Sequence, residues 1–404
     1  MKRLIGAMLV LAAAPAAMAD DLLFEPWPSV AKVDLDDTAL TALLKDNANA
    51  SINLVSVDSA KVSPEAQVLT FALEPGLVVQ FRRKNSYTTD DGSTVWYGLA
   101  DFKGRGNASD DGEIDDDPLD SVMLVQNGEK VTGNIRYAHR MFALRPLHGA
   151  PHAIVEIDDR LMPPDHPAEF KSIPEVAMGP VVGGKAISTI RVMVVVTTAA
   201  QSASGDWNGL VNLAIAETNQ GYTNSGVEIS LVKAGAYSTT YKESSSFSTD
   251  LSRFRGTTDG YMDSFHSTRN SVTADVMMLL INNSSSCGLA SGIGSSASTA
   301  FAVAHWSCAT GYYSFGHEIG HLQSARHDPA ADPTNSPYAY GHGYRYDSGR
   351  WRTIMAYNCP AGCTRINYWS TPGKTYGGVP VGTTSTHHNQ RVLQNTKATI
   401  AAFR

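Results

Sequence analysis

The residues His317–His321 read His-Glu-Ile-Gly-His, and a third histidine follows at His327. On a helix, residues four positions apart lie on one face, so His317 and His321 can reach the same metal ion. His327 is too far along the chain to share that face, so the helix has to end and the chain has to turn back. The spacing therefore predicts a metal-binding helix over residues 310–324, followed by a tight turn.

The residue types in this stretch are those of a hydrolytic zinc centre. Such a centre uses three neutral protein ligands, leaves one coordination position open for water, and holds a base beside that water. We expect His317, His321 and His327 to be the ligands and Glu318, one residue round the helix, to be the general base. The alternative is a surface helix with scattered histidines. Two features argue against this alternative: Met355 in a downstream Thr-Ile-Met-Ala-Tyr segment, and an export signal.

Together these residues resemble the metzincin zinc metalloproteases, whose signature is HExxHxxGxxH followed by a methionine turn. Asp328, directly after the third histidine, resembles the reprolysin branch, whereas Tyr357 after Met355 resembles the astacin and serralysin branches. This combination, with a long acidic N-terminal part, is most similar to the bacterial peptidyl-Asp metallopeptidases. The resemblance covers residues 187–404 and implies an α+β fold, in which a mixed twisted β-sheet packs with the helix that carries the histidines.

The resemblance also implies roles for further residues. Tyr357 would stabilise the oxyanion that forms during peptide hydrolysis, and a packed aromatic residue is the alternative. Met355 would form a hydrophobic floor beneath one catalytic Zn²⁺ ion, and Asp328 would orient the neighbouring backbone. A catalytically inactive metzincin-fold binding or adhesion protein is the alternative to an endopeptidase, but such a protein has no need for Glu318.

The sequence departs from the metzincin pattern at one position. The family has glycine three residues after the second histidine, where a left-handed backbone turns the chain toward the third ligand, and this chain has Ser324. A residue with a side chain costs about 1 kcal/mol more than glycine at positive φ. That cost is small beside the free energy of zinc binding, so His327 remains the expected third ligand.

Composition divides the chain into parts. Residues 1–19 have a basic start, an apolar run and a small-residue cleavage motif, which predicts a signal peptide and a secreted protein, extracellular or periplasmic; a retained N-terminal anchor is the alternative. Residues 20–160 are acidic, and we expect them to form a propeptide domain that acts as an intramolecular inhibitor. The apolar runs described below predict that this domain is β-rich. A proline-rich linker with the processing site near Lys185 follows over residues 161–186, and the catalytic domain over residues 187–404.

Hydrophobic patterning predicts the elements of both parts. Apolar or alternating runs predict strands in the acidic part, with a hairpin turn at Asn127-Gly128; these runs are residues 68–73, 77–81, 121–125 and 153–157. In the catalytic part, the expected strands are residues 189–197, 227–233, 274–281 and 301–305. The expected helices there are residues 206–223, 251–267, 310–324 and 389–404.

Four cysteines in an exported chain favour two disulfides, and four cysteines allow three pairings. The most local pairing joins Cys287 to Cys308 and Cys359 to Cys363, and it would brace the segment that follows Met355. A four-cysteine zinc site is the alternative, but the spacings do not fit paired CxxC motifs.

The expected partners are protein or peptide substrates. The resemblance to metzincins implies that the segment after the methionine turn lines the pocket for the residue after the cleaved bond. Arg365 or Lys374 would then bind an acidic side chain and favour cleavage before Asp or Glu, and ordinary surface cations are the alternative.

Calcium could bind the acidic residues 107–117, but their spacing does not support it. The sequence has no basic run interleaved with aromatic residues, so nothing in it indicates nucleic-acid binding. No apolar run of membrane-spanning length follows the signal peptide.

Overall fold

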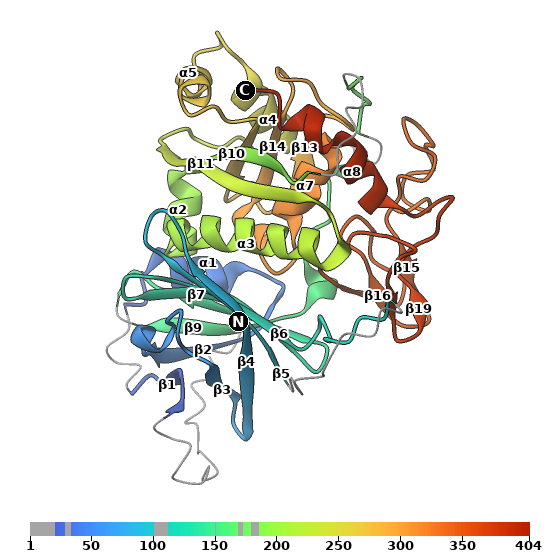
Figure 1. Cartoon of the computed structure of the whole chain (residues 1–404). Helices are drawn as coiled ribbons and strands as arrows, with labels where there is room; N and C mark the ends of the chain where they lie inside the picture. Colours follow the sequence, from blue (N-terminus) through green and yellow to red (C-terminus); the bar gives the residue numbers. More distant parts are fainter. Residues whose placement is uncertain (1–20, 29–33, 101–111, 150, 169–172, 179–185) are drawn as a thin grey trace. The chain divides into compact units, whose positions relative to one another are not determined.

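A computed structural model describes residues 21–404 except for residues 29–33, 101–111, 150, 169–172 and 179–185 (Figure 1). The chain forms two compact units. Unit 1 comprises residues 1–108, 115–162 and 201–213, and unit 2 comprises residues 109–114, 163–200 and 214–404. The expected signal peptide and the expected processing site near Lys185 lie outside the described residues.

Unit 1 is built around an antiparallel sheet of nine strands in the order β1-β2-β9-β8-β7-β6-β5-β4-β3 (Figure 1). The strands are β1 (Phe24–Pro26), β2 (Asn49–Val57), β3 (Val68–Glu74), β4 (Leu77–Thr88), β5 (Thr94–Ala100), β6 (Ser121–Asn127), β7 (Lys130–Tyr137), β8 (Arg140–Pro146) and β9 (His152–Ile157). Leu23, just before β1, donates its backbone N–H to the carbonyl of Thr70 in β3 at 2.8 Å. The two edges of the sheet therefore meet, and the sheet closes on itself like a barrel.

Alternation along these strands places one face of the sheet in the core of unit 1. Phe71 and Phe81 are fully buried there and pack edge to face, with ring centroids 5.2 Å apart. The four predicted strands are present, and the predicted hairpin turn lies between β6 and β7, with Gly128 at φ +62°. The sequence did not predict several elements of unit 1. These are strands β1, β2, β5 and β8, the short turns η3 (Ser59–Lys61) and η4 (Asp159–Leu161), and helix α1 (Thr38–Lys45).

Unit 2 contains a five-stranded sheet in the order β11-β10-β12-β14-β13. The strands are β10 (Ser188–Thr197), β11 (Ile229–Thr239), β12 (Val276–Ile281), β13 (Gly288–Ala290) and β14 (Phe301–His305). All neighbouring strands are parallel except β13, which lies at one edge and is antiparallel to β14. Strands β12 and β14 are buried along their whole length, as parallel strands covered on both faces require.

Helices lie between and after the strands of this sheet along the chain (Figure 1). They are α2 (Thr198–Ser204), α3 (Trp207–Ser225), α4 (Phe247–Arg255), α5 (Ser264–Ser271), α6 (Trp306–Ala309), α7 (Ser314–Leu322) and α8 (Asn389–Ile400), and the boundary between the two units runs through α2 and α3. Helices α4 and α7 both contact β13 and β14. Phe247 and Phe254 of α4 join Met193 and Met277 of the sheet in one apolar cluster. This mixture of helices and a mixed sheet agrees with the predicted α+β class.

One predicted helix is wrong in its extent. Residues 251–267 do not form a single helix, because α4 ends at Arg255 and α5 begins at Ser264. The backbone of Gly256 is extended at the end of α4, and Gly260 has φ +84°, a left-handed conformation that cannot continue a helix. Apolar spacing alone did not reveal these two breaks.

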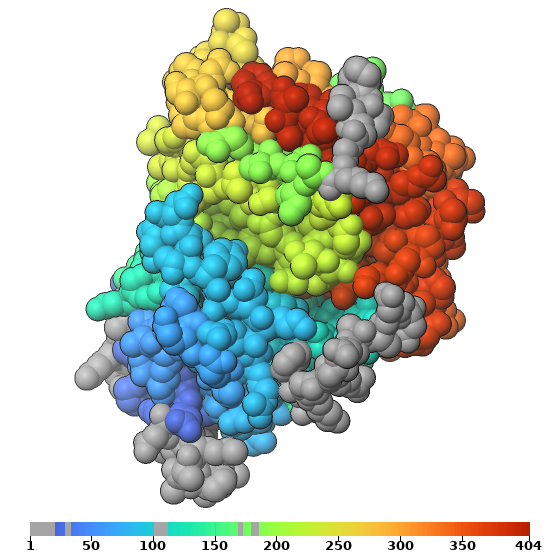
Figure 2. All heavy atoms as spheres, viewed as in Figure 1, coloured from blue at the N-terminus to red at the C-terminus, as the bar shows by residue number. Residues whose placement is uncertain are grey.

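After α7 the chain is irregular up to α8. The strands in this region have two residues each: β15 (Arg345–Tyr346), β16 (Trp351–Arg352), β17 (Thr364–Arg365), β18 (Thr375–Tyr376) and β19 (Val379–Pro380). These C-terminal residues, orange to red, gather on one side of unit 2 (Figure 2). The disulfides have the preferred pairing, Cys287 with Cys308 and Cys359 with Cys363. Among the described residues, no helix is both long enough and apolar enough to cross a membrane.

A buried histidine in β9 makes the stability of unit 1 depend on pH. His152 is buried, and its Nε2 accepts a hydrogen bond from the backbone N–H of Val131 at 3.0 Å. Burial, with a smaller contribution from the charge of Lys130, lowers the pKa of His152 from 6.5 to about 4. Between these two values the unfolded chain binds a proton that the folded chain does not.

We therefore expect unit 1 to lose up to about 3 kcal/mol of stability as the pH falls from neutral to about 4, because protonation then favours the unfolded state. Urea unfolding of the full chain, followed by hydrogen exchange in β7 and β9, measures this loss. His152→Gln keeps an acceptor for Val131 and should flatten the pH dependence. An unchanged dependence in this variant would show that another group is responsible.

Candidate metal centre

Helix α7 ends in a turn that redirects the chain toward the third histidine. It is shorter than the predicted range of residues 310–324. The N–H of Ala325 bonds to the carbonyl of Gly320 at 2.9 Å, and the N–H of Ser324 bonds to the carbonyl of His321 at 2.8 Å. This pair of bonds is the Schellman C-cap, which glycine usually closes. Ser324 has φ +75°, so it adopts the left-handed conformation expected for it.

The structure brings the three predicted ligands together. Nε2 of His321 lies 3.1 Å from Nε2 of His317 and 2.9 Å from Nε2 of His327, and the last two atoms are 3.2 Å apart. A tetrahedral zinc ion with Zn–N bonds of about 2.0–2.1 Å holds its nitrogen ligands about 3.3 Å apart. All three side chains are buried. Nitrogens this close together fit a single metal ion between them.

Hydrogen bonds on the opposite side of two of the rings, those of His317 and His321, fix their tautomers. Nδ1 of His317 donates to the carbonyl of Ile354 at 3.0 Å, and Nδ1 of His321 donates to the carbonyl of Ala325 at 2.8 Å. Because Nδ1 carries the hydrogen, Nε2 presents its lone pair to the centre. Burial first, and nearby positive charge second, hold the pKa of all three candidate ligand histidines well below its usual value. The rings are therefore neutral, which metal binding requires.

The helix packs on a floor made by two buried side chains, Met355 and Trp369. A Cβ atom added to Gly320 would lie 2.6 Å from the Trp369 ring and 3.2 Å from Sδ of Met355. Glycine is thus required between the first two histidines for the helix to approach this floor. Ile354, whose carbonyl accepts the hydrogen bond of His317, directly precedes Met355, so one turn positions both the floor and a candidate ligand.

Asp328 and Tyr357 are connected through the backbone. Oδ2 of Asp328 accepts a hydrogen bond from the N–H of Tyr357 at 2.9 Å. The ring centroid of Tyr357 lies 4.4 Å from that of His327. Burial, and then the charges of Asp165 and Glu318, raise the pKa of the Tyr357 phenol above its usual value, so the hydroxyl keeps its proton. A protonated hydroxyl here can donate a hydrogen bond to an anion.

Glu318 has the environment of a proton acceptor. It is buried, and its carboxylate lies so close to the backbone of Gly288 that a Cβ atom there would collide with it. Its Oε2 has no hydrogen-bond partner among the described residues. Burial raises the pKa of Glu318, against the lowering effect of the nearby His166. A buried carboxylate with an unpaired oxygen and a raised pKa is suited to general-base catalysis.

The cluster also contains His166, which was not predicted from the sequence as a site residue. Its ring centroid lies 4.6 Å from that of His327 and 4.9 Å from that of His321. Its Nε2 lies 3.2 Å from Oε1 of Glu318. His166 and the three predicted ligands form a group whose candidate ligand atoms all lie within 4.8 Å of one another. The structure therefore adds a fourth histidine to the predicted three.

The neighbouring Asp165 lies between two buried arginines. Nη2 of Arg365 donates to its two carboxylate oxygens at 2.8 and 2.9 Å, and Nη1 of Arg352 lies 3.8 Å from Oδ2. Both guanidinium groups lie over the ring of Tyr312, at 4.4 and 5.2 Å from its centroid. Of the two cations expected to bind an acidic side chain, Arg365 lies here. Lys374 precedes β18 and, within the described part of the chain, its amine forms no ion pair with Asp165.

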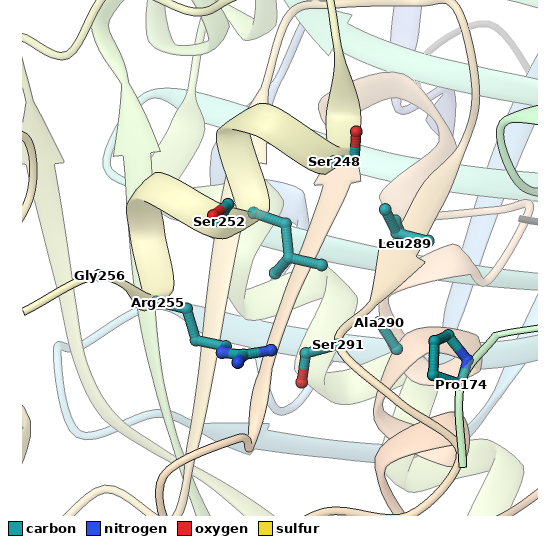
Figure 3. Close-up of a pocket in the computed structure, with 9 residues that line it drawn as sticks. Pro174, Ser248, Ser252, Arg255, Gly256, Leu289, Ala290 and Ser291 are labelled. Atoms are coloured by element: carbon teal, nitrogen blue, oxygen red, sulfur yellow. The ribbon is translucent and has the colours of Figure 1, made fainter. Parts of the chain in front are cut away.

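A separate cavity of about 420 Å³ lies beside the edge strand β13 (Figure 3). Ser252 and Arg255 of α4 line one side, and Leu289, Ser291 and Pro174 line the other. None of the clustered histidines lines this cavity. The cavity is therefore distinct from the candidate metal centre, although β13 borders both.

Known proteins are similar to this chain over nearly its whole length. The model of Metallo-peptidase family M12 matches residues 187–370. A peptidyl-Asp metalloendopeptidase of Stenotrophomonas maltophilia (strain R551-3) is 51% identical over 415 residues, which cover 99% of this chain and 97% of that protein. The protein of the same name from Xanthomonas campestris pv. campestris is 48% identical over 412 residues, with 99% and 98% covered. The one from Pseudomonas fragi is 52% identical over 190 residues, which cover 46% of this chain and 100% of that protein.

We expect Gly320→Ala to destabilise unit 2 by about 1–3 kcal/mol, because the added methyl group collides with the Trp369 ring. Alanine is a better helix former than glycine, so helix propensity alone would stabilise the variant. A net loss of stability therefore reports the collision. Calorimetric unfolding of the metal-free chain measures it. Trp369→Phe removes the ring atoms nearest to the new methyl group, so the double variant should be less destabilised than the sum of the single variants. Additive effects would contradict the contact.

Proposed function

The chain belongs to metallopeptidase family M12, and we propose that it is a secreted zinc endopeptidase, made as a proenzyme, that cleaves peptide bonds on the N-terminal side of aspartate. The observation that carries this proposal is the convergence of three neutral imidazoles on one buried point beside Glu318. The relatives named peptidyl-Asp metalloendopeptidase support a catalytic protein over an inactive binding protein. The signal-like residues 1–19 support secretion.

In this proposal, His317, His321 and His327 hold the zinc ion. A zinc ion held there would supply Lewis-acid chemistry, which makes a nearby water molecule more acidic and polarises the carbonyl group of the scissile bond. Glu318 accepts the proton of the attacking water on its unpaired Oε2 and later delivers it to the leaving amine. Tyr357 donates a hydrogen bond from its protonated hydroxyl to the carbonyl oxygen as that oxygen becomes negative.

The two buried arginines support specificity for aspartate. Burying a cation without a partner is strongly unfavourable, so the pocket of Arg365 and Arg352 needs a carboxylate. An aspartate of the substrate, placed where Asp165 lies, would supply it at the distances seen for Asp165. A neutral side chain would leave the guanidinium groups without this partner. Glutamate is one methylene longer than the side chain that fits, so we expect a preference for aspartate.

We expect Glu318→Gln to lower kcat by about 10²–10⁴-fold, because an amide of the same size cannot accept the proton. Its zinc content should be unchanged, since Glu318 is not one of the three ligands. Peptide cleavage and atomic absorption measure the two quantities. His317→Ala is the matched control and should lose zinc and activity together. A Glu318→Gln enzyme within tenfold of the parent would require a different base.

We expect Arg365→Ala in the mature enzyme to lower kcat/KM for a peptide with Asp after the scissile bond by at least about 30-fold, relative to the matched Asn peptide. The reason is the loss of the guanidinium partner for the substrate carboxylate. Arg365→Lys keeps the charge without the planar fork and should be intermediate. Lys374→Ala is the matched control and should keep the parent ratio. Equal losses on both peptides would show that Arg365 supports the fold and does not recognise the substrate.

A further inference from the structure

We propose that Asp165 and His166 form an internal latch, in which Asp165 fills the pocket for the substrate aspartate and His166 covers the zinc site. The inference rests on the zinc centre and the acidic pocket proposed above. It goes beyond them by naming the two adjacent residues that keep the proenzyme inactive.

The segment that carries the latch is held along the edge strand β13. The backbone N–H groups of Cys287 and Gly288 donate to the carbonyls of Pro164 and Asp165 at 2.8 and 3.0 Å. Farther along the same segment, Ile173 is buried in the apolar cluster of unit 2. Unit 2 therefore holds the chain on both sides of the latch, and the latch residues enter the site from a fixed backbone.

His166 faces the three candidate ligands and the general base together. Its side chain is fully buried, and its Nε2 donates a hydrogen bond to Oε1 of Glu318 at 3.2 Å. Its Nδ1 has no hydrogen-bond partner among the described residues. Since Nε2 carries the hydrogen, Nδ1 presents a lone pair. A metal ion held by the three candidate ligand nitrogens would satisfy this buried lone pair. In the latch, His166 thus takes the place of the attacking water and binds the carboxylate of Glu318, which would otherwise activate that water.

Asp165 provides the second contact of the latch. Its carboxylate lies 2.8 and 2.9 Å from Nη2 of Arg365, in a setting where both groups are almost fully buried. Buried ions remain charged only when they are paired, so the ion pair holds the carboxylate in the pocket. A substrate carboxylate needs the same guanidinium group. The pocket therefore cannot accept a substrate while Asp165 is in place.

The latch blocks the site without presenting a bond for cleavage. A cut before Asp165 would require the carbonyl carbon of Pro164 to lie within reach of a water molecule held beside Glu318. That carbonyl instead accepts the N–H of Cys287, and an imidazole faces Glu318. Pro164 and Pro167 flank the pair, and their fixed φ angles reduce the entropy lost when the segment is held.

Removal of the segment opens more than the metal site. Pro174 of the same segment lines the cavity beside β13 (Figure 3). When the segment leaves, the N–H groups of Cys287 and Gly288 lose their acceptors. An extended substrate can provide new carbonyl acceptors along this edge strand, as peptides do when they add to a sheet. A substrate with aspartate would thus replace the contacts of the latch one by one.

The test uses the uncut full-length chain with Co²⁺ in place of zinc and azide as the probe. Azide changes the visible spectrum of Co²⁺ when it binds at an open coordination position. We expect no change for the parent chain, because His166 occupies this position, and a clear change for His166→Ala. His139→Ala removes an exposed histidine between β7 and β8; it is the matched control and should behave as the parent.

The outcomes separate the latch from the proposed function. Azide binding by the uncut parent chain, equal to that of His166→Ala, would overturn the latch and leave the zinc endopeptidase proposal standing. Co²⁺ binding that is the same in the parent and in His317→Ala would overturn the metal centre, and the latch with it.

A second measurement tests Asp165 without depending on the folding of a variant chain. A synthetic peptide of residues 158–168 should inhibit the mature enzyme competitively. Peptides with Asp165→Asn or His166→Ala should inhibit at least tenfold more weakly, because each lacks one of the two contacts. The peptide with Asp159→Asn is the matched control and should equal the parent peptide. Equal potency of all four peptides, or no inhibition by the parent peptide, would overturn the roles assigned to the pair.

Discussion

The convergence of three imidazole lone pairs on one buried point is the constraint on which the rest of the site depends. Lone pairs on nitrogens 2.9–3.2 Å apart repel one another, so the surrounding bonds must hold them until a cation lies between them. The carbonyls of Ile354 and Ala325 hold two of the rings. The left-handed Ser324 redirects the chain so that the third histidine reaches the same point. The turn at Ile354 and the C-cap of α7 are therefore parts of the candidate metal centre itself.

The pocket for the carboxylate is tied to the same turn. Arg352 and Arg365 donate to the carbonyl of Ala356 at 2.6 and 3.2 Å, one residue after Met355. The groups that would bind an acidic side chain of the substrate thus also brace the backbone beneath the candidate metal site. A carboxylate in the pocket neutralises the arginines and stabilises this turn, so in the proposed enzyme substrate recognition would be coupled to the geometry of the three histidines.

Local patterns made the helix of the candidate metal centre, the strands β10, β11, β12 and β14 and the preferred disulfide pairing predictable, whereas the short edge strand β13 was not predicted. The fourth histidine was not predictable in this way, since 152 residues separate His166 from Glu318 and only the fold brings them together. Prolines around His166 indicate a linker, because proline disfavours regular structure, although here they flank a buried segment. Arg365 and Lys374 were equal candidates from the sequence, because a sequence does not show which of two cations is buried.

In the proposed latch, latency and specificity follow from one binding equilibrium. The carboxylate of Asp165 and that of a substrate compete for Arg365, so a pocket that binds the substrate more tightly also binds the latch more tightly. The latch is part of the same chain, and its effective concentration exceeds that of ordinary substrates until the connection is cut. After the cut this advantage disappears, and the segment can dissociate. The part of the chain before Cys287 has no cysteine that could silence zinc as a thiolate. A histidine at the metal, anchored by an aspartate in the enzyme's own specificity pocket, achieves the same end with the residues available.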